Sequence, residues 1–311
     1  MMISRFFALA LLGSAFAMHA QQEGSIPTQS IVTVDAKTPQ ALTVSTLTAK
    51  VNRHESKITN VVPVRPNGTQ VALLIDDGLR TSVGRQLPDL KNFITSLPAG
   101  VEILVGYMQN GRVVPVQPFT TNHAAAAANL RLPMGSPGLS ASPYFCLSDF
   151  VKSWPGGEQD TAASPMAPKA RFVMMLTNGV DPYNGSVSPL NQNSPYVDSA
   201  IADAQRAGVP VYSIYYGDAG IRGGAASFSG QSYLAQVAEA TGGRGYYQGL
   251  GNPVSITPFL KQFTSAIAES FVVTYDAVGS KLVEVNFSTK LPKTKVNAAK
   301  MVLPGTRLDA N

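Results

Sequence analysis

An unbroken apolar run that ends in two carboxylates constrains this chain more than any other feature. Val71 to Ile75 is followed directly by Asp76, Asp77 and Gly78. Five consecutive apolar residues suit a strand buried on both faces, as in a parallel sheet covered by helices. In open α/β sheets, ligands bind outside the carboxyl ends of the strands, next to the point where the strand order reverses. We therefore expect Asp76 and Asp77 to lie at a functional edge.

Strands and helices alternate after this run. The pattern predicts a strand at 101–108, buried strands at 171–177 and 209–216, and a short edge strand at 245–248. It predicts helices at 80–97, 121–132, 142–154, 197–207, 232–241 and 256–270. Pro88 is expected to kink the first helix, and residues 217–230 to form a glycine-rich loop. Asn110-Gly111 predicts a hairpin, so the strand at 113–119 should be an antiparallel edge strand. The fold class expected is α/β, with a doubly wound, mostly parallel six-stranded sheet.

The two ends of the chain differ from this alternating region. Residues 1–20 have the positive start, the short apolar stretch and the small residues of a secretory signal peptide. Cleavage is expected after Ala20 rather than Ala17, and the apolar stretch is short for an uncleaved anchor. We expect four segments: a signal peptide (1–20), a β-rich lead-in (21–66), an α/β domain (67–270) and a β-rich C-terminal extension (271–311).

The composition excludes several classes of protein. With 311 residues, of which 44% are hydrophobic and 14% charged, the chain can bury a large core. Its single cysteine, Cys146, rules out an internal disulfide and a thiolate zinc site. The formal charge of +5 is densest in the C-terminal lysines, which alternate with apolar residues and predict a solvated sheet face. We therefore expect no nucleic-acid binding.

Catalysis has little support in the residues. His54 and His123 lie in different parts of the chain, and Cys146 lies on an apolar helix face. Nucleophilic catalysis needs a nucleophile paired with a base, and no such pairing is indicated. The glycine-rich segments lack the spacing of phosphate-binding loops. The sequence predicts a protein that is not an enzyme.

Four stretches resemble a von Willebrand factor type A domain. They are Val71 to Gly78, Gln117 to Asn122, Phe172 to Asp181 and Ala207 to Tyr212. Phe271 to Tyr275, followed by Gly279-Ser280-Lys281, is similar to the tail of an exported bacterial, largely acidobacterial, group of such domains. The resemblance covers nearly all of the chain after the signal peptide. It implies a Rossmann-like fold and a role in binding other molecules.

The resemblance also implies a metal-ion-dependent adhesion site, from which this chain departs. In the family, an Asp-x-Ser-x-Ser turn, a threonine and an aspartate in a Thr-Asp-Gly turn hold Mg²⁺. Asp76 matches the first aspartate, but Gly78 and Arg80 stand in place of the serines; counting from Asp77 places Leu79 and Thr81 there instead. The threonine position falls on Ser142 or Ser140, and the later aspartate is Asn178.

We therefore expect a degenerate site in which Arg80 takes the place of the metal beside Asp76. A guanidinium is a permanent cation whose geometry suits a carboxylate. Two alternatives remain: Asp76 simply caps the next helix, or Asp76, Asp77, Ser142 and Asp181 gather a weakly bound Ca²⁺. No confident metal ligand and no cofactor are predicted, with Mg²⁺ or Ca²⁺ as the remaining option.

These residues lead to two functional hypotheses. In the first, the chain is a binding module that grips another protein or an envelope polymer without a metal. Its binding face comprises Asp76, Asp77, Gly78, Arg80, Ser140, Ser142, Asn178 and Asp181. In the second, it is a scaffold component of a cell-envelope assembly, with contacts through the β-rich ends and a vestigial site; a weak Mg²⁺- or Ca²⁺-dependent adhesion domain is a further variant. Both place the protein in the periplasm or outside the cell, without a membrane span once the signal peptide is removed.

Overall fold

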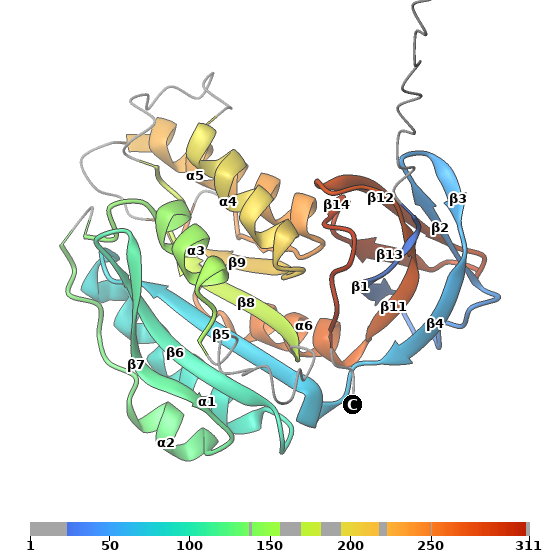
Figure 1. Ribbon diagram of the computed structural model, residues 1–311. Coiled ribbons are helices and arrows are strands. Elements are labelled where there is room, and N and C mark those ends of the chain that lie inside the picture. Colours follow the sequence, from blue (N-terminus) through green and yellow to red (C-terminus); the bar gives the residue numbers. More distant parts are fainter. Residues whose placement is uncertain are drawn as a thin grey trace, which may run out of the picture.

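A helix-covered sheet lies beside a β-sandwich in the computed structural model of the chain (Figure 1). The structure describes residues 24–136, 139–155, 169–181, 194–217, 223–249 and 251–308. The predicted signal peptide lies outside these residues. Among the helices of this part of the chain, none combines the length and the apolar character needed to cross a membrane.

The larger sheet has six strands in the order β10-β9-β8-β5-β6-β7. Five strands are parallel, and β7 pairs with β6 in the antiparallel direction, as predicted. The chain first builds β5, β6 and β7 on one side, then returns to build β8, β9 and β10 on the other. The carboxyl ends of β5 and β8 therefore flank the point where strand order reverses. The strands are β5 (Thr69–Asp76), β6 (Glu102–Gln109), β7 (Arg112–Thr120), β8 (Ala170–Thr177), β9 (Val211–Tyr215) and β10 (Gly245–Tyr246).

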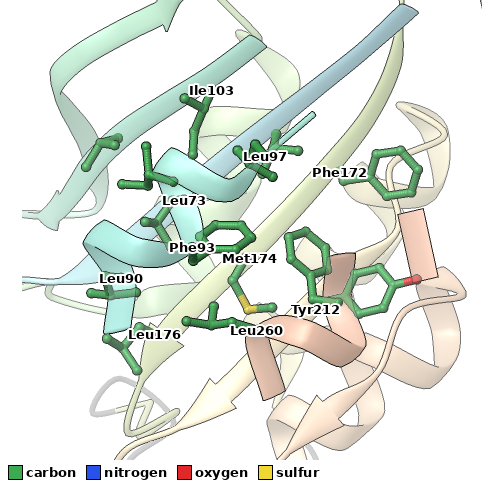
Figure 2. Packing of buried hydrophobic residues seen from close by; sticks show 14 of the residues in the cluster. Leu73, Leu90, Phe93, Leu97, Ile103, Phe172, Met174, Leu176, Tyr212 and Leu260 are labelled. Atoms are coloured by element: carbon green, nitrogen blue, oxygen red, sulfur yellow. The ribbon is translucent and has the colours of Figure 1, made fainter. Parts of the chain in front are cut away.

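Helices cover both faces of this sheet. Because side chains alternate along a strand, Leu73 of β5 enters the core under one set of helices and Leu74 the core under the other. Figure 2 shows the first core, in which Phe93 and Leu260 pack with Leu73. The helices on that face are α1 (Leu87–Ser96), α2 (His123–Ala128) and α6 (Thr257–Ala268); those on the other are α3 (Pro143–Lys152), α4 (Pro195–Arg206) and α5 (Gly223–Thr241).

Two predicted elements were wrong in detail. Pro88 does not kink a long helix: a 3₁₀ helix, η2 (Thr81–Gln86), precedes it, and Pro88 lies in the first turn of α1, where its missing N–H leaves no gap in the hydrogen bonding. The predicted loop at 217–230 ends early, because α5 begins at Gly223. Gly230 allows α5 to pack closely against the turn after β8, since a Cβ atom on it would lie 2.1 Å from the carbonyl oxygen of Asn178.

The lead-in and the C-terminal extension combine into one β-sandwich. Its two antiparallel sheets have the orders β13-β1-β11-β4 and β14-β12-β2-β3, so each mixes strands from both ends of the chain. Ser30 and Tyr275, 245 residues apart, form a buried hydrogen bond of 2.8 Å. The strands are β1 (Ile26–Asp35), β2 (Leu47–Val51), β3 (His54–Ser56), β4 (Ile58–Pro63), β11 (Ser270–Ala277), β12 (Val283–Thr289), β13 (Lys295–Ala298) and β14 (Met301–Val302).

The sandwich is joined to the helix-covered sheet at several points. The chain passes from β4 through η1 (Pro66–Gly68) into β5, and from α6 directly into β11. Arg244 forms an ion pair with Asp35 across the junction, with 2.5 Å between Nη2 and Oδ2. Gly242 has a φ of +85°, and a Cβ atom there would lie 2.4 Å from the carbonyl carbon of Ala298. The two bodies thus approach closely enough that only glycine fits at this position.

Candidate functional site

Asp76 ends β5 and is buried, with 3% of the residue exposed. Its Oδ1 accepts a hydrogen bond of 2.9 Å from the N–H of Gly78, and its Oδ2 accepts one of 2.8 Å from the hydroxyl of Thr177 at the end of β8. The side chain of Ser140 also acts on this carboxylate and helps to lower its pKa. Burial raises the pKa of Asp76, and these hydrogen bonds only partly oppose it. The carboxylate therefore joins the turn after β5 to the end of β8 at the point where strand order reverses.

Asp77 is also buried, but an arginine balances its charge. The guanidinium of Arg131 binds both carboxylate oxygens, at 2.7 Å and 2.8 Å. The N–H of Met134 donates to Oδ1 at 2.9 Å, and the side-chain amide of Gln109 donates to Oδ2. Burial alone would raise the pKa of Asp77, but the hydrogen bonds from Arg131, Met134 and Gln109 and the positive charge of Arg131 lower it below its ordinary value.

Arg131 is itself fixed by β6. Its guanidinium carbon lies 3.7 Å from the centroid of the Tyr107 ring, which is cation–π geometry. The Tyr107 hydroxyl donates to the carbonyl of Arg131 and accepts from its N–H at 2.9 Å. A third hydrogen bond of the guanidinium, 2.8 Å long, goes to the carbonyl of Leu132. Arg131 therefore holds the segment after α2 against the acidic turn (Asp76 to Gly78), together with the N–H of Met134.

Ser140 and Ser142 lie in the loop before α3 and have different roles. Ser142 is the N-cap of α3, as its sequence predicted, and its hydroxyl accepts a 3.3 Å hydrogen bond from the N–H of Tyr144. The carbonyl of Ser140 accepts from the N–H of Gly111 at 2.9 Å, which links this loop to the β6–β7 hairpin. Of the two serines, Ser140 is the one whose side chain lowers the pKa of Asp76.

Asn178 and Asp181 stabilise the turn after β8. The Asn178 side chain accepts a 3.0 Å hydrogen bond from the N–H of Val180, which is an Asx turn. Asp181 is buried and accepts a 2.7 Å hydrogen bond from Ser194, the N-cap of α4. Tyr144 donates to the carbonyl of Gly179 at 2.7 Å. Both polar side chains are thus engaged in shaping the loop.

The predicted site residues are close together but arranged differently from the prediction. The guanidinium on the acidic turn belongs to Arg131 and binds Asp77, whereas Arg80 is exposed and precedes η2. Sequence reasoning missed Arg131, and it did not count Thr177 among the site residues. The proximity of Gln109 to Asp77 could have been predicted from the strand pairing. Gln109 ends β6, the strand next to β5, and Asp76 pairs with Met108. The next residues along the two strands, Asp77 and Gln109, are therefore neighbours.

A divalent ion does not fit the donor set seen here. Mg²⁺ requires near-octahedral oxygen ligands, and Ca²⁺ six to eight. Both oxygens of Asp76 and of Asp77 already accept hydrogen bonds from protein groups, and Arg131 supplies the positive charge. Asp181 is turned to Ser194. Over the described ranges, no group of three or more His, Cys, Asp or Glu side chains could hold a metal ion.

Comparison with known proteins adds structural likenesses only. No family model matches the sequence, and no curated protein matches it. The solved structures similar to this one include proximal thread matrix protein 1 from the mussel byssus, with a TM-score of 0.44 and 16% identity over 67% of this chain and 49% of that one. The von Willebrand factor type A protein from Catenulispora acidiphila has a TM-score of 0.44 and 11% identity, over 91% of this chain and 75% of its own.

The ArnB paralog VWA2 from Sulfolobus acidocaldarius is a third similar structure, with a TM-score of 0.38 and 10% identity over 89% of this chain and 76% of that one. Several of the similar structures are von Willebrand factor type A domains. This chain spans about half the length of the mussel protein. Because all these identities and TM-scores are low, the fold assignment rests on the strand order described above.

Proposed function

We propose that the chain is a non-catalytic, adhesion-type binding module that recognises another protein or an envelope polymer through the loops at the carboxyl ends of β5 and β8, without a divalent ion. The ion pair between Asp77 and Arg131 is the observation that carries this proposal. In a metal-dependent site, a bound cation organises the loops. Here a guanidinium bound to both oxygens of a buried carboxylate supplies that charge from within the chain.

The apolar part of the contact surface in this proposal is the segment that follows Arg131, which is bound against the loop at the end of β5. Leu132 is 49% exposed and Met134 is 64% exposed, although the N–H of Met134 is bound to Asp77. Leu132 packs along η2, where it leaves no room for a Cβ atom at Gly84. Large apolar side chains on a backbone that is already ordered are effective binding anchors, because less conformational entropy is lost on association.

The groups at this edge support binding rather than catalysis. The Cys146 thiol is buried, and burial raises its pKa far above neutrality, so it stays protonated. The His123 ring lies at the other end of the sheet, where its Nε2 is 2.8 Å from the carbonyl of Val101. In the part of the chain that the structure describes, no hydrogen bond joins a serine, threonine or cysteine side chain to a histidine, and we infer that the module is not an enzyme.

We further propose that the protein works in the periplasm or outside the cell, because its first twenty residues resemble a cleavable signal peptide. Cell fractionation, followed by mass spectrometry of the mature N-terminus, tests this. A mature chain that begins at Gln21 in the exported fraction is the expected result. An intact N-terminus in the cytoplasmic fraction would contradict it.

Photo-crosslinking from single positions tests the binding face. A photoreactive amino acid at Met134 is compared with the same group at Val278, which is 47% exposed on the sandwich. We expect a discrete adduct from position 134, formed equally with and without EDTA, and none from position 278. Adducts from position 278 alone would favour the scaffold function, and loss of the adduct in EDTA would refute metal independence.

A further inference from the structure

Positive charge is concentrated in the β-sandwich. Residues 24–66 and 270–308 contain eleven lysine and arginine residues and four aspartate and glutamate residues, an excess of seven positive charges. The whole chain has an excess of only five, so the remainder of the chain is slightly acidic. Such an asymmetry produces a field that favours an anionic partner on one side of the molecule.

Three of these lysines lie within six residues, in a segment we call the basic turn (Lys290 to Lys295). The sequence pattern predicted a solvated face of strands, but Lys290 and Lys293 lie in the turn between β12 and β13, and only Lys295 is on a strand. Asp35, the residue opposite Lys295, has its carboxylate bound to Arg244. Over the described ranges, no ion pair engages the three lysines, and all three are exposed.

An exposed apolar side chain lies on the loop next to the basic turn. Val44 is 46% exposed, within a turn closed by the hydrogen bond of 3.1 Å from the N–H of Thr46 to the carbonyl of Thr43. The carbonyl of Thr46 accepts a 2.9 Å hydrogen bond from the N–H of Lys290, so this loop and the basic turn are tied together. Lysines beside a protruding apolar side chain suit the boundary between lipid headgroups and acyl chains.

We propose that the basic turn and the loop of Val44 bind the surface of an anionic lipid bilayer. Lysines act as hydrated point charges and suit a laterally extended charged surface, whereas arginine favours bidentate recognition of single phosphates. A single-stranded nucleic acid needs aromatic side chains for its bases to stack on. The exposed large apolar residues of the described sandwich are Ile26, Val44 and Val278, none of them aromatic. The proposal is independent of the binding face at the sheet edge.

Co-sedimentation with vesicles tests it. The purified protein is mixed with vesicles of phosphatidylcholine alone or of equal parts phosphatidylcholine and phosphatidylglycerol, at low and at high salt. One variant carries Lys290→Gln, Lys293→Gln and Lys295→Gln. The matched control loses the same charge at Lys91, Lys152 and Lys261, all outside the sandwich. Thermal melts establish that both variants fold.

We expect binding to the anionic vesicles only, weakened by salt. The basic-turn variant should lose about 100-fold in apparent affinity, since each lysine near an anionic surface contributes roughly a factor of five, and the control should change little. Equal binding to neutral vesicles, or equal losses in the two variants, would overturn the proposal. Binding to heparin or polyphosphate without binding to vesicles would replace the lipid surface with a soluble polyanion.

Discussion

Charged side chains are buried and paired at the carboxyl edge of the six-stranded sheet, whereas in the basic turn of the sandwich they are exposed and, among the described residues, unpaired. At the sheet edge, Asp76 and Asp77 are buried and every carboxylate oxygen accepts a hydrogen bond from the protein. In the basic turn, lysines are exposed to solvent. A buried charge must be compensated locally, because its desolvation is costly, whereas an exposed charge acts at a distance through its field. The first region therefore determines loop structure, and the second attracts partners.

The largest effect should come from removing the internal cation. Arg131→Ala leaves the buried carboxylate of Asp77 without its counter-charge, and we expect a loss of about 3 kcal/mol in the free energy of unfolding, at the low end for a buried pair because Arg131 is 35% exposed. Urea unfolding measures it. Asp77→Asn with Arg131→Ala should recover part of the loss, since no uncompensated charge is then buried. A single variant as stable as the wild type would show that the pair does not organise the edge.

The contributions of Asp76 and Asp77 to folding stability should change in opposite directions with pH. The pKa of Asp77 in the folded protein lies below its ordinary 3.8, so its stabilisation is present above that value and is lost as the pH falls through the lowered pKa. The pKa of Asp76 lies above 3.8, so the folded state takes up the proton first, and stability rises as the pH falls through the raised pKa towards 3.8.

Urea unfolding at a series of pH values, on wild type, Asp76→Asn and Asp77→Asn, separates the two contributions. On acidification the wild type should gain stability relative to the Asp76 variant and lose stability relative to the Asp77 variant. The stability difference between wild type and each variant is plotted against pH. Slopes of the same sign for the two variants would mean that both carboxylates share one environment, contrary to this prediction.

A smaller effect is expected at the basic turn. The triple variant Lys290→Gln, Lys293→Gln and Lys295→Gln should unfold at the same urea concentration as the wild type, because exposed, unpaired side chains contribute little to stability. Differential scanning calorimetry provides a second measurement. A clear drop in the midpoint would indicate that these lysines hold the sandwich together and would remove the contrast with the sheet edge.

The smallest effect is expected from divalent ions. Addition of millimolar Mg²⁺ or Ca²⁺, or of EDTA, should leave the thermal midpoint unchanged, because a ligand stabilises the folded state only in proportion to its binding. The Arg131→Ala variant is titrated alongside the wild type for comparison, since its acidic turn lacks the internal cation. An ion-dependent rise in the wild-type midpoint would restore the metal-dependent site.

The strand run at 71–75, the Asn110-Gly111 hairpin and the Ser142-Pro143 helix start were predicted correctly, because each depends on residues close in sequence. Asn110 and Gly111 have φ values of 47° and 78°, as the turn requires. The arginine at the site was misplaced, because proximity in sequence favoured Arg80, whereas Arg131 reaches Asp77 from a segment 54 residues away.

The alternation of strands and helices, and with it the edge of the sheet where polar loops meet, follows from the amino-acid sequence alone. Apolar periodicity and turn residues encode these features locally. The union of the two chain ends in one sandwich and the pairing of Arg131 with Asp77 become visible only in the folded structure. Both depend on which distant segments pair, and that choice is made by the burial and hydrogen bonding of the whole fold rather than by local pattern.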